Sequence, residues 1–148
     1  MDKLKLDIIT QEKKVYQDEV DSVTAPASEG EVTILPRHIP LFTRLNPGEI
    51  TLKKGSQETH IVVTGGFMDV SFPNKVTILA DAAARAEEID VKKAEEAKRR
   101  AEELLEQKLS RQEMLVVEAS LRKAVLELKV ARRTRRRSHT PFPSEFSS

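Results

Sequence analysis

Residues 75–105, KVTILADAAARAEEIDVKKAEEAKRRAEELL, contain the change of pattern that decides the fold. The opening KVTILA alternates apolar and polar residues, which is the period of two of a half-buried β-strand. From about residue 84 onward Ala, Glu, Lys, Arg and Leu dominate, and these residues are strong helix formers. No glycine follows, and the next proline is Pro141. The sequence therefore predicts a β domain over residues 1–83 and an α-helical domain over residues 84–133.

The β domain repeats this alternation between short turn signals. The segments with a period of two are LKLDI (4–8), EVTIL (31–35), EITLK (49–53), HIVVT (60–64), FMDVSF (67–72) and KVTILA (75–80). Turn residues separate them at Ser28-Glu29-Gly30, Asn46-Pro47-Gly48, Lys54-Gly55, Gly65-Gly66 and Pro73-Asn74. Several short strands at such spacing are typical of an antiparallel sandwich or barrel. We expect a β-sandwich.

The α-helical domain divides into two helices at Leu109-Ser110. Asp90 can cap the first helix, and Glu95 and Arg99 are spaced for an ion pair one turn apart. The motif SRQE (110–113) is a capping box, with Ser110 as the N-cap and Glu113 three residues later. The apolar positions recur every three or four residues, at Ala94, Ala97, Ala101, Leu104 and Leu105, then at Met114, Val117, Leu121, Ala124, Leu128 and Ala131.

Two helices with so short a link either lie antiparallel or form a broken rod, and we expect the antiparallel hairpin. The stripe on the first helix is mostly alanine, so its partner can approach closely while little apolar area is buried. The hairpin is therefore expected to be weakly held. Residues 134–148, rich in Ser, Pro and Arg, are expected to form a disordered basic tail.

Composition excludes several classes of function. The 148 residues include no Cys, and the formal net charge is only +1, which argues against a general polyelectrolyte binder of nucleic acid. No stretch is apolar enough to span a membrane, and MDKLKLDIIT does not resemble a secretory signal. The three His residues show no pairing with Asp or Glu at metal-ligand spacing, and Gly65-Gly66 lacks the frame of a phosphate-binding loop. We expect no catalytic residue and no metal site.

The basic run RRTRRR (132–137) could bind nucleic acid or anionic lipid, but no aromatic platform accompanies it. The other interpretation is a solvated helix end, where basic side chains are favoured. From the residues alone, the chain reads as a sandwich with a detachable helical hairpin, acting as an interaction subunit.

The order of the motifs resembles the ε subunit of bacterial F-type ATP synthases over about residues 3–132. The resemblance is carried by SEGEVTILPRHIP (28–40), TGGFMDV (64–70) and VTILAD (76–81), followed by the Ala/Glu/Lys-rich helix pair. It implies a ten-stranded β-sandwich with a two-helix C-terminal domain. It further implies a non-catalytic subunit of the central rotor that contacts the γ subunit and the c-ring and supports proton-driven ATP synthesis. The complex would lie at the cytoplasmic face of the bacterial plasma membrane, reached by this chain only through its partners.

The resemblance also implies where the contacts lie. Glu31 and His38 correspond to the loop that faces γ and the c-ring. The helices of the family can swing up into the α/β catalytic hexamer and block ATP hydrolysis. A basic face of the second helix would then meet an acidic segment of the β subunits, and it comprises Arg122, Lys123, Lys129, Arg132 and Arg133.

Some bacterial members bind ATP between hairpin and sandwich through the pattern I/L-D-x-x-R-A. Here the pattern reads Ile89-Asp90-Val91-Lys92-Lys93-Ala94, so Lys93 replaces the arginine, while Arg100 is kept. On the second helix two arginine positions of the family are Lys123 and Glu127, and a preceding glutamate is Ala84. Lysine does not replace the forked phosphate contact of arginine, and Glu127 would repel phosphate. We expect ATP to be at most a weak regulatory ligand, with no cofactor required. The motif also fits a plain capped helix start.

Overall fold

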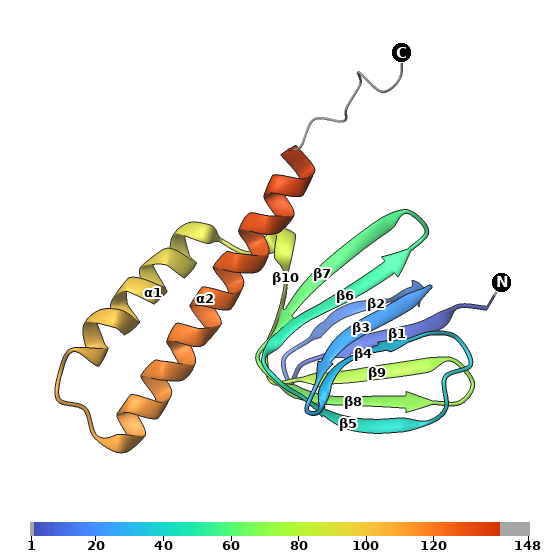
Figure 1. The fold of residues 1–148 in the computed structure, drawn as a ribbon, viewed down its shortest axis with the longest axis horizontal. Helices are drawn as coiled ribbons and strands as arrows, with labels where there is room; N and C mark the ends of the chain where they lie inside the picture. The colour runs from blue at the N-terminus through green and yellow to red at the C-terminus, as the bar shows by residue number, and fades with distance from the viewer. Residues whose placement is uncertain (1, 140–148) are drawn as a thin grey trace, which may run out of the picture. The chain divides into compact units, whose positions relative to one another are not determined.

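The structure is a computed structural model that describes the backbone of residues 2–139 and the side chains of residues 2–136 (Figure 1). The chain divides into two compact units, Met1–Glu88 and Ile89–Ser148. The predicted boundary at residue 83 is five residues too early. The reason is that Ala84 and Arg85, expected to open the helical domain, form with Ala83 a strand that pairs with Ile61–Val63 of the sandwich.

The predicted ten-stranded sandwich is confirmed. The strands are β1 (Leu4–Ile9), β2 (Lys14–Val20), β3 (Ser22–Ala27), β4 (Gly30–Ile34), β5 (Leu41–Leu45), β6 (Gly48–Lys54), β7 (Gln57–Val63), β8 (Gly66–Ser71), β9 (Lys75–Ala80) and β10 (Ala83–Arg85). Their order is β10-β7-β6-β3-β5-β8-β9-β1-β2, with β4 paired to β3. Among the described pairs, β1 with β9 is parallel and the others are antiparallel.

The alternating apolar residues form the core of the sandwich. In β8 and β9, Met68, Val70, Val76 and Ile78 are buried while their neighbours in sequence face outward. Every predicted turn signal lies at the end of a strand. Gly66 has a φ of 142°, and a Cβ there would collide with the carbonyl oxygen of Leu79 and lie 2.9 Å from the Cα of Ala80. A glycine is therefore required where β8 starts beside the end of β9.

Arg85 connects β10 to β2, which is the strand at the other end of the sheet order. Its Nη2 donates a hydrogen bond to the carbonyl oxygen of Val15 at 3.1 Å, and its guanidinium lies 5.2 Å from the centre of the Tyr16 ring. Burial raises the pKa of Tyr16. This contact joins β10 to β2 where no strand pairing joins them.

The second unit is the expected antiparallel hairpin, with α1 (Val91–Leu105) packed along α2 (Arg111–His139) (Figure 1). A short 3₁₀ turn, η1 (Ala86–Glu88), precedes it in the first unit. Asp90 caps α1 by accepting a hydrogen bond from the backbone N–H of Lys93 at 3.2 Å. Ser110 and Glu113 form the predicted capping box, with bonds of 3.2 and 3.1 Å.

The seam between the helices is confirmed in part. Ala94 and Ala101 are buried on α1, and Ala124, Leu128 and Ala131 are buried on α2. Ala97 is exposed instead, because it lies about 60° around α1 from Ala94, whereas Ala101 lies within about 20° of it. Met114, at the start of α2, is also exposed.

The end of α2 lies beyond the predicted limit at residue 133. The helix continues to His139, so residues 134–139 are not part of a disordered tail. This segment contains arginines, which favour helix, and no glycine or proline. The rest of the predicted tail, 140–148, lies outside the described residues.

Candidate functional site

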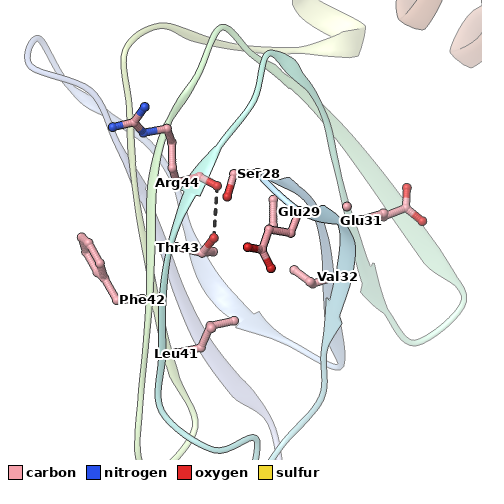
Figure 2. A pocket seen from close by; sticks show the side chains of 10 residues that line it. Ser28, Glu29, Glu31, Val32, Leu41, Phe42, Thr43 and Arg44 are labelled. Atoms are coloured by element: carbon pink, nitrogen blue, oxygen red, sulfur yellow. Dashed lines mark hydrogen bonds between the residues drawn. The ribbon is translucent and has the colours of Figure 1, made fainter.

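Glu31 lies at the start of β4, beside an open hollow of about 600 Å³. The hollow forms because β4 and β5 both adjoin β3 but diverge, with β5 paired to β3 only at Ala27 and Leu45. Ser28 closes its end by donating its N–H to the carbonyl oxygen of Arg44 at 2.9 Å. Glu29 lies between the two strands, whereas the carboxylate of Glu31 points outward into solvent (Figure 2). Glu31 is thus available to a partner.

His38 lies in the loop that follows the other end of β4. Its Nδ1 is 2.6 Å from the carbonyl oxygen of Ile39 and donates to it. The loop is held by Arg37, whose N–H donates to Asn74 Oδ1 at 2.6 Å and whose Nε pairs with Asp2 Oδ2 at 2.8 Å. Glu31 and His38 are therefore at opposite ends of one strand. A single partner group cannot contact both, although a broad surface can.

An exposed apolar strip crosses the outer face of the sheet, and we define it as Phe42, Phe67 and Leu79. Phe67 on β8 pairs directly with Leu79 on β9, and the ring of Phe42 on β5 stacks on that of Phe67 with centroids 5.6 Å apart. Their side chains are 68%, 40% and 54% exposed. Contiguous exposed apolar side chains mark contact surfaces. The sequence reasoning missed this strip because it did not identify β5.

His60 is, with Ser22, one of the buried polar residues of the sandwich. Its Nδ1 is 2.9 Å from Glu49 Oε2 and its Nε2 is 3.1 Å from Glu58 Oε1, across the paired strands β6 and β7. The sequence reasoning, which looked only for metal-ligand spacing, did not identify these contacts of His60. Alternate residues of paired strands face the same side, which brings these three together. No group of three metal-ligating side chains suited to an ion occurs among residues 2–136.

Four of the candidate ATP residues, at positions 89, 90, 93 and 94, lie at the start of α1, whereas Arg100 lies farther along α1 and Lys123 lies near the middle of α2. Ile89 and Ala94 are buried, and Lys93, Arg100 and Lys123 are exposed. The carboxylate of Asp90 caps α1, as described above, and the carbonyl oxygen of Ile89 accepts a hydrogen bond from Arg135 Nη2 at 2.6 Å. The helix-capping interpretation of the motif is thus confirmed. Nucleotide binding stays a prediction.

The predicted basic face is only partly available in the folded hairpin. Arg122, Lys123 and Lys129 are exposed on α2. Arg132 instead reaches across to α1, where its Nη2 pairs with Glu95 Oε1 at 2.9 Å. Arg133 is half-buried. The helices carry many charges, and within the described part of the chain none of them is long and apolar enough to cross a membrane.

Comparison with known families covers most of the chain. Residues 3–86 match the β-sandwich domain of the ATP synthase delta/epsilon chain, and residues 87–132 match its long α-helix domain.

Two relatives with curated names are similar over nearly their full length. The ATP synthase epsilon chain of Dehalococcoides mccartyi is 50% identical over 92% of this chain and 97% of the relative. That of Herpetosiphon aurantiacus is 46% identical over 90% and 98% respectively.

Among solved structures, a chain in the mitochondrial ATP synthase of Euglena gracilis, described as OSCP/F1/c-ring, has a TM-score of 0.63 at 24% identity, covering 93% of this chain and 82% of that one. A chain in the central stalk and c-ring of the Tetrahymena thermophila enzyme has a TM-score of 0.57 at 18% identity, covering 88% and 97%. At these identities the structural likeness establishes the fold.

Proposed function

The chain belongs to the ATP synthase delta/epsilon chain family, and we propose that it is the epsilon subunit of an F-type ATP synthase, situated on the central stalk. In this role it has no catalytic residue of its own. It joins the γ subunit to the c-ring while proton flow drives ATP synthesis. It reaches the cytoplasmic face of the bacterial plasma membrane only through the complex.

The apolar strip is the observation that best supports attachment to γ. Phe42, Phe67 and Leu79 leave an apolar surface on a folded sheet, and covering such a surface stabilises an assembly. The outward carboxylate of Glu31 and the half-buried His38 lie at opposite ends of β4 and offer polar groups to a broad partner surface. We assign these two residues to the contact with γ and the c-ring.

Inhibition of ATP hydrolysis is assigned to the helical hairpin. Its seam is small, so the hairpin can leave its folded arrangement at modest cost. The basic face of α2 then pairs with an acidic segment of the β subunits. Attraction between exposed charges is screened by salt, with a Debye length of about 10 Å at 0.1 M ionic strength. Inhibition should therefore weaken as salt is added.

Reconstitution tests both parts of this proposal. The chain is added to an α/β/γ complex lacking it, and binding and ATP hydrolysis are measured at low and at moderate salt. We expect tight binding at both, with inhibition that is stronger at low salt. The variant with Arg122→Glu and Lys129→Glu should bind equally well and inhibit less, while Lys98→Glu on α1 serves as a control of equal charge change per site. Inhibition that is indifferent to salt and to these substitutions would contradict the electrostatic account.

A further inference from the structure

We propose that two arginines of α2 form a latch at the open end of the hairpin, and that this latch withholds Arg132 from the inhibitory contact. The latch consists of the ion pair Arg132–Glu95 and the hydrogen bond from Arg135 to the carbonyl oxygen of Ile89. The inference rests on the proposed function only where it concerns inhibition. The latch itself concerns contacts within the hairpin.

The small seam leaves the hairpin in need of other contacts. Among the described residues of the two helices six apolar side chains are buried. Four of these are on α2 and include Leu128 and Val130, but the two on α1 are both alanines. Alanine loses little area on burial, so the seam alone gives limited resistance to opening. The connection of residues 106–110 holds the helices together only at one end. Contacts at the other end therefore decide how often the helices separate.

The latch lies at that other end. Glu95 is in the first turns of α1, and Ile89 immediately precedes the capping residue Asp90. Their partners, Arg132 and Arg135, lie one turn apart in the last part of α2, so both project toward the beginning of α1. The carbonyl of Ile89 lies outside the helical ladder, and a charged donor is its partner at 2.6 Å.

The two contacts differ in strength and in response to salt. Both side chains of the Arg132–Glu95 pair are about half exposed, at 55% and 52%, so water and salt weaken their attraction. Arg135 is only partly exposed, and its hydrogen bond to a neutral carbonyl depends less on ionic strength. We therefore expect Arg135 to provide most of the closure and Arg132 to make it sensitive to salt.

Closure and inhibition compete for the same side chain. While Arg132 Nη2 is paired with Glu95 Oε1 at 2.9 Å, the guanidinium is held on α1 and cannot form a bidentate contact with a carboxylate of another subunit. Substituting Glu95 should thus favour inhibition in two ways, by loosening the hairpin and by freeing Arg132. Substituting Arg135, which is not part of the predicted basic face, should act only through opening.

The full chain allows opening to be measured directly, because it has no native cysteine that would interfere with labelling. Spin labels at Glu102→Cys and Val125→Cys, both exposed, report the separation of α1 and α2 by pulsed dipolar spectroscopy. We expect Glu95→Gln to raise the ratio of open to closed hairpin by up to about fivefold, and Arg135→Gln by about tenfold. Arg111→Gln, at an exposed arginine that begins α2 at the opposite end of the hairpin, is the matched control and should change nothing. The charge exchange Glu95→Arg with Arg132→Glu should restore closure.

The outcomes separate the latch from the proposed function. An open population that does not change in Glu95→Gln and Arg135→Gln overturns the latch, whatever happens to ATP hydrolysis. An open population that rises supports it. If ATP hydrolysis by the reconstituted complex then falls further in Arg135→Gln, the latch also opposes inhibition. If hydrolysis does not respond, the latch stands and the inhibitory role of the helices fails.

Discussion

Replacing Phe42 by alanine should weaken binding to γ far more than it weakens the fold. The side chain is 68% exposed in the free chain. An aromatic side chain of roughly 200 Å² would therefore lose about 140 Å² of exposed area if a partner covered it fully. At about 25 cal/mol per Å², and allowing for the Cβ that alanine keeps, the truncation costs about 2–3 kcal/mol. The dissociation constant should rise about 30- to 150-fold.

Phe72 provides a control of the same residue type and nearly the same exposure, at 69%. It lies in the turn between β8 and β9, beyond the ends of the strands that carry the strip. Phe72→Ala should leave the dissociation constant for γ within about threefold of the parent, in the range of a surface change.

Calorimetric titration of γ with each variant gives both constants, and thermal unfolding of the free chains checks the fold. Loss of the Phe42–Phe67 stacking should cost only about 1 kcal/mol in the free chain. Equal binding by the parent and Phe42→Ala would exclude the strip from the interface. A larger effect of Phe72→Ala would place the contact at the loop end of the sandwich.

Three further predictions concern stability, acid and nucleotide. Gly66→Ala should lower the free energy of unfolding by about 2–5 kcal/mol in urea titrations, because it adds a steric clash to the cost of a positive φ. Gly30 also has a positive φ, 131°, but a Cβ there would meet open space, so Gly30→Ala should lower the free energy of unfolding by only about 1–2 kcal/mol. Equal losses of stability in the two variants would contradict the clash at Gly66. The hydrogen bond from Lys3 lowers the pKa of Asp21, so its contribution to stability is present above the ordinary pKa of about 4 and is lost as the pH falls below it. In Asp21→Asn the urea concentration at half-unfolding should therefore decrease less between about pH 4 and pH 2 than in the parent. An unchanged decrease would show that the Lys3–Asp21 ion pair does not stabilise the fold. Calorimetric titration with ATP should give no dissociation constant tighter than millimolar, and Lys93→Arg should strengthen the heat signal; tight binding by the parent would refute the loss of the phosphate contact.

Residue patterns predicted the strands whose two faces differ most in polarity. β1, β4, β6, β7, β8 and β9 alternate clearly and were recognisable from the sequence alone. β2 exposes most of its side chains at an edge of the sheet, and β3 contains Pro26, so neither shows a clean apolar face. β5 carries an aromatic residue on its outer face, which obscures the alternation. That the strands number ten followed from the family resemblance.

Contacts between distant segments could not be predicted from local spacing. Glu95 and Arg99 are placed for a pair along one helix, but the carboxylate of Glu95 contacts Arg132 on the other helix. The alignment of α1 along α2 sets that contact, and it depends on the length of the connection and on the seam together. His60 meets Glu49 for a similar reason, because the register of β6 on β7 places Glu49 on its side of the hairpin, whereas Glu58 lies two residues away on the same strand.

The parallel pairing of β1 with β9 has a consequence for the order in which the chain folds during synthesis. Lys5 lies opposite Lys75, so the first strand must wait for a partner that the ribosome adds 70 residues later. Meanwhile β2 can cover only one edge of β1, and the other edge stays open to pairing with foreign strands. Long-range pairing of this kind is slow, whereas the hairpin of α1 and α2 needs only local contacts. The nascent sandwich is thus the stage at which aggregation threatens this chain, and early capture by a chaperone or by its assembly partner would protect it.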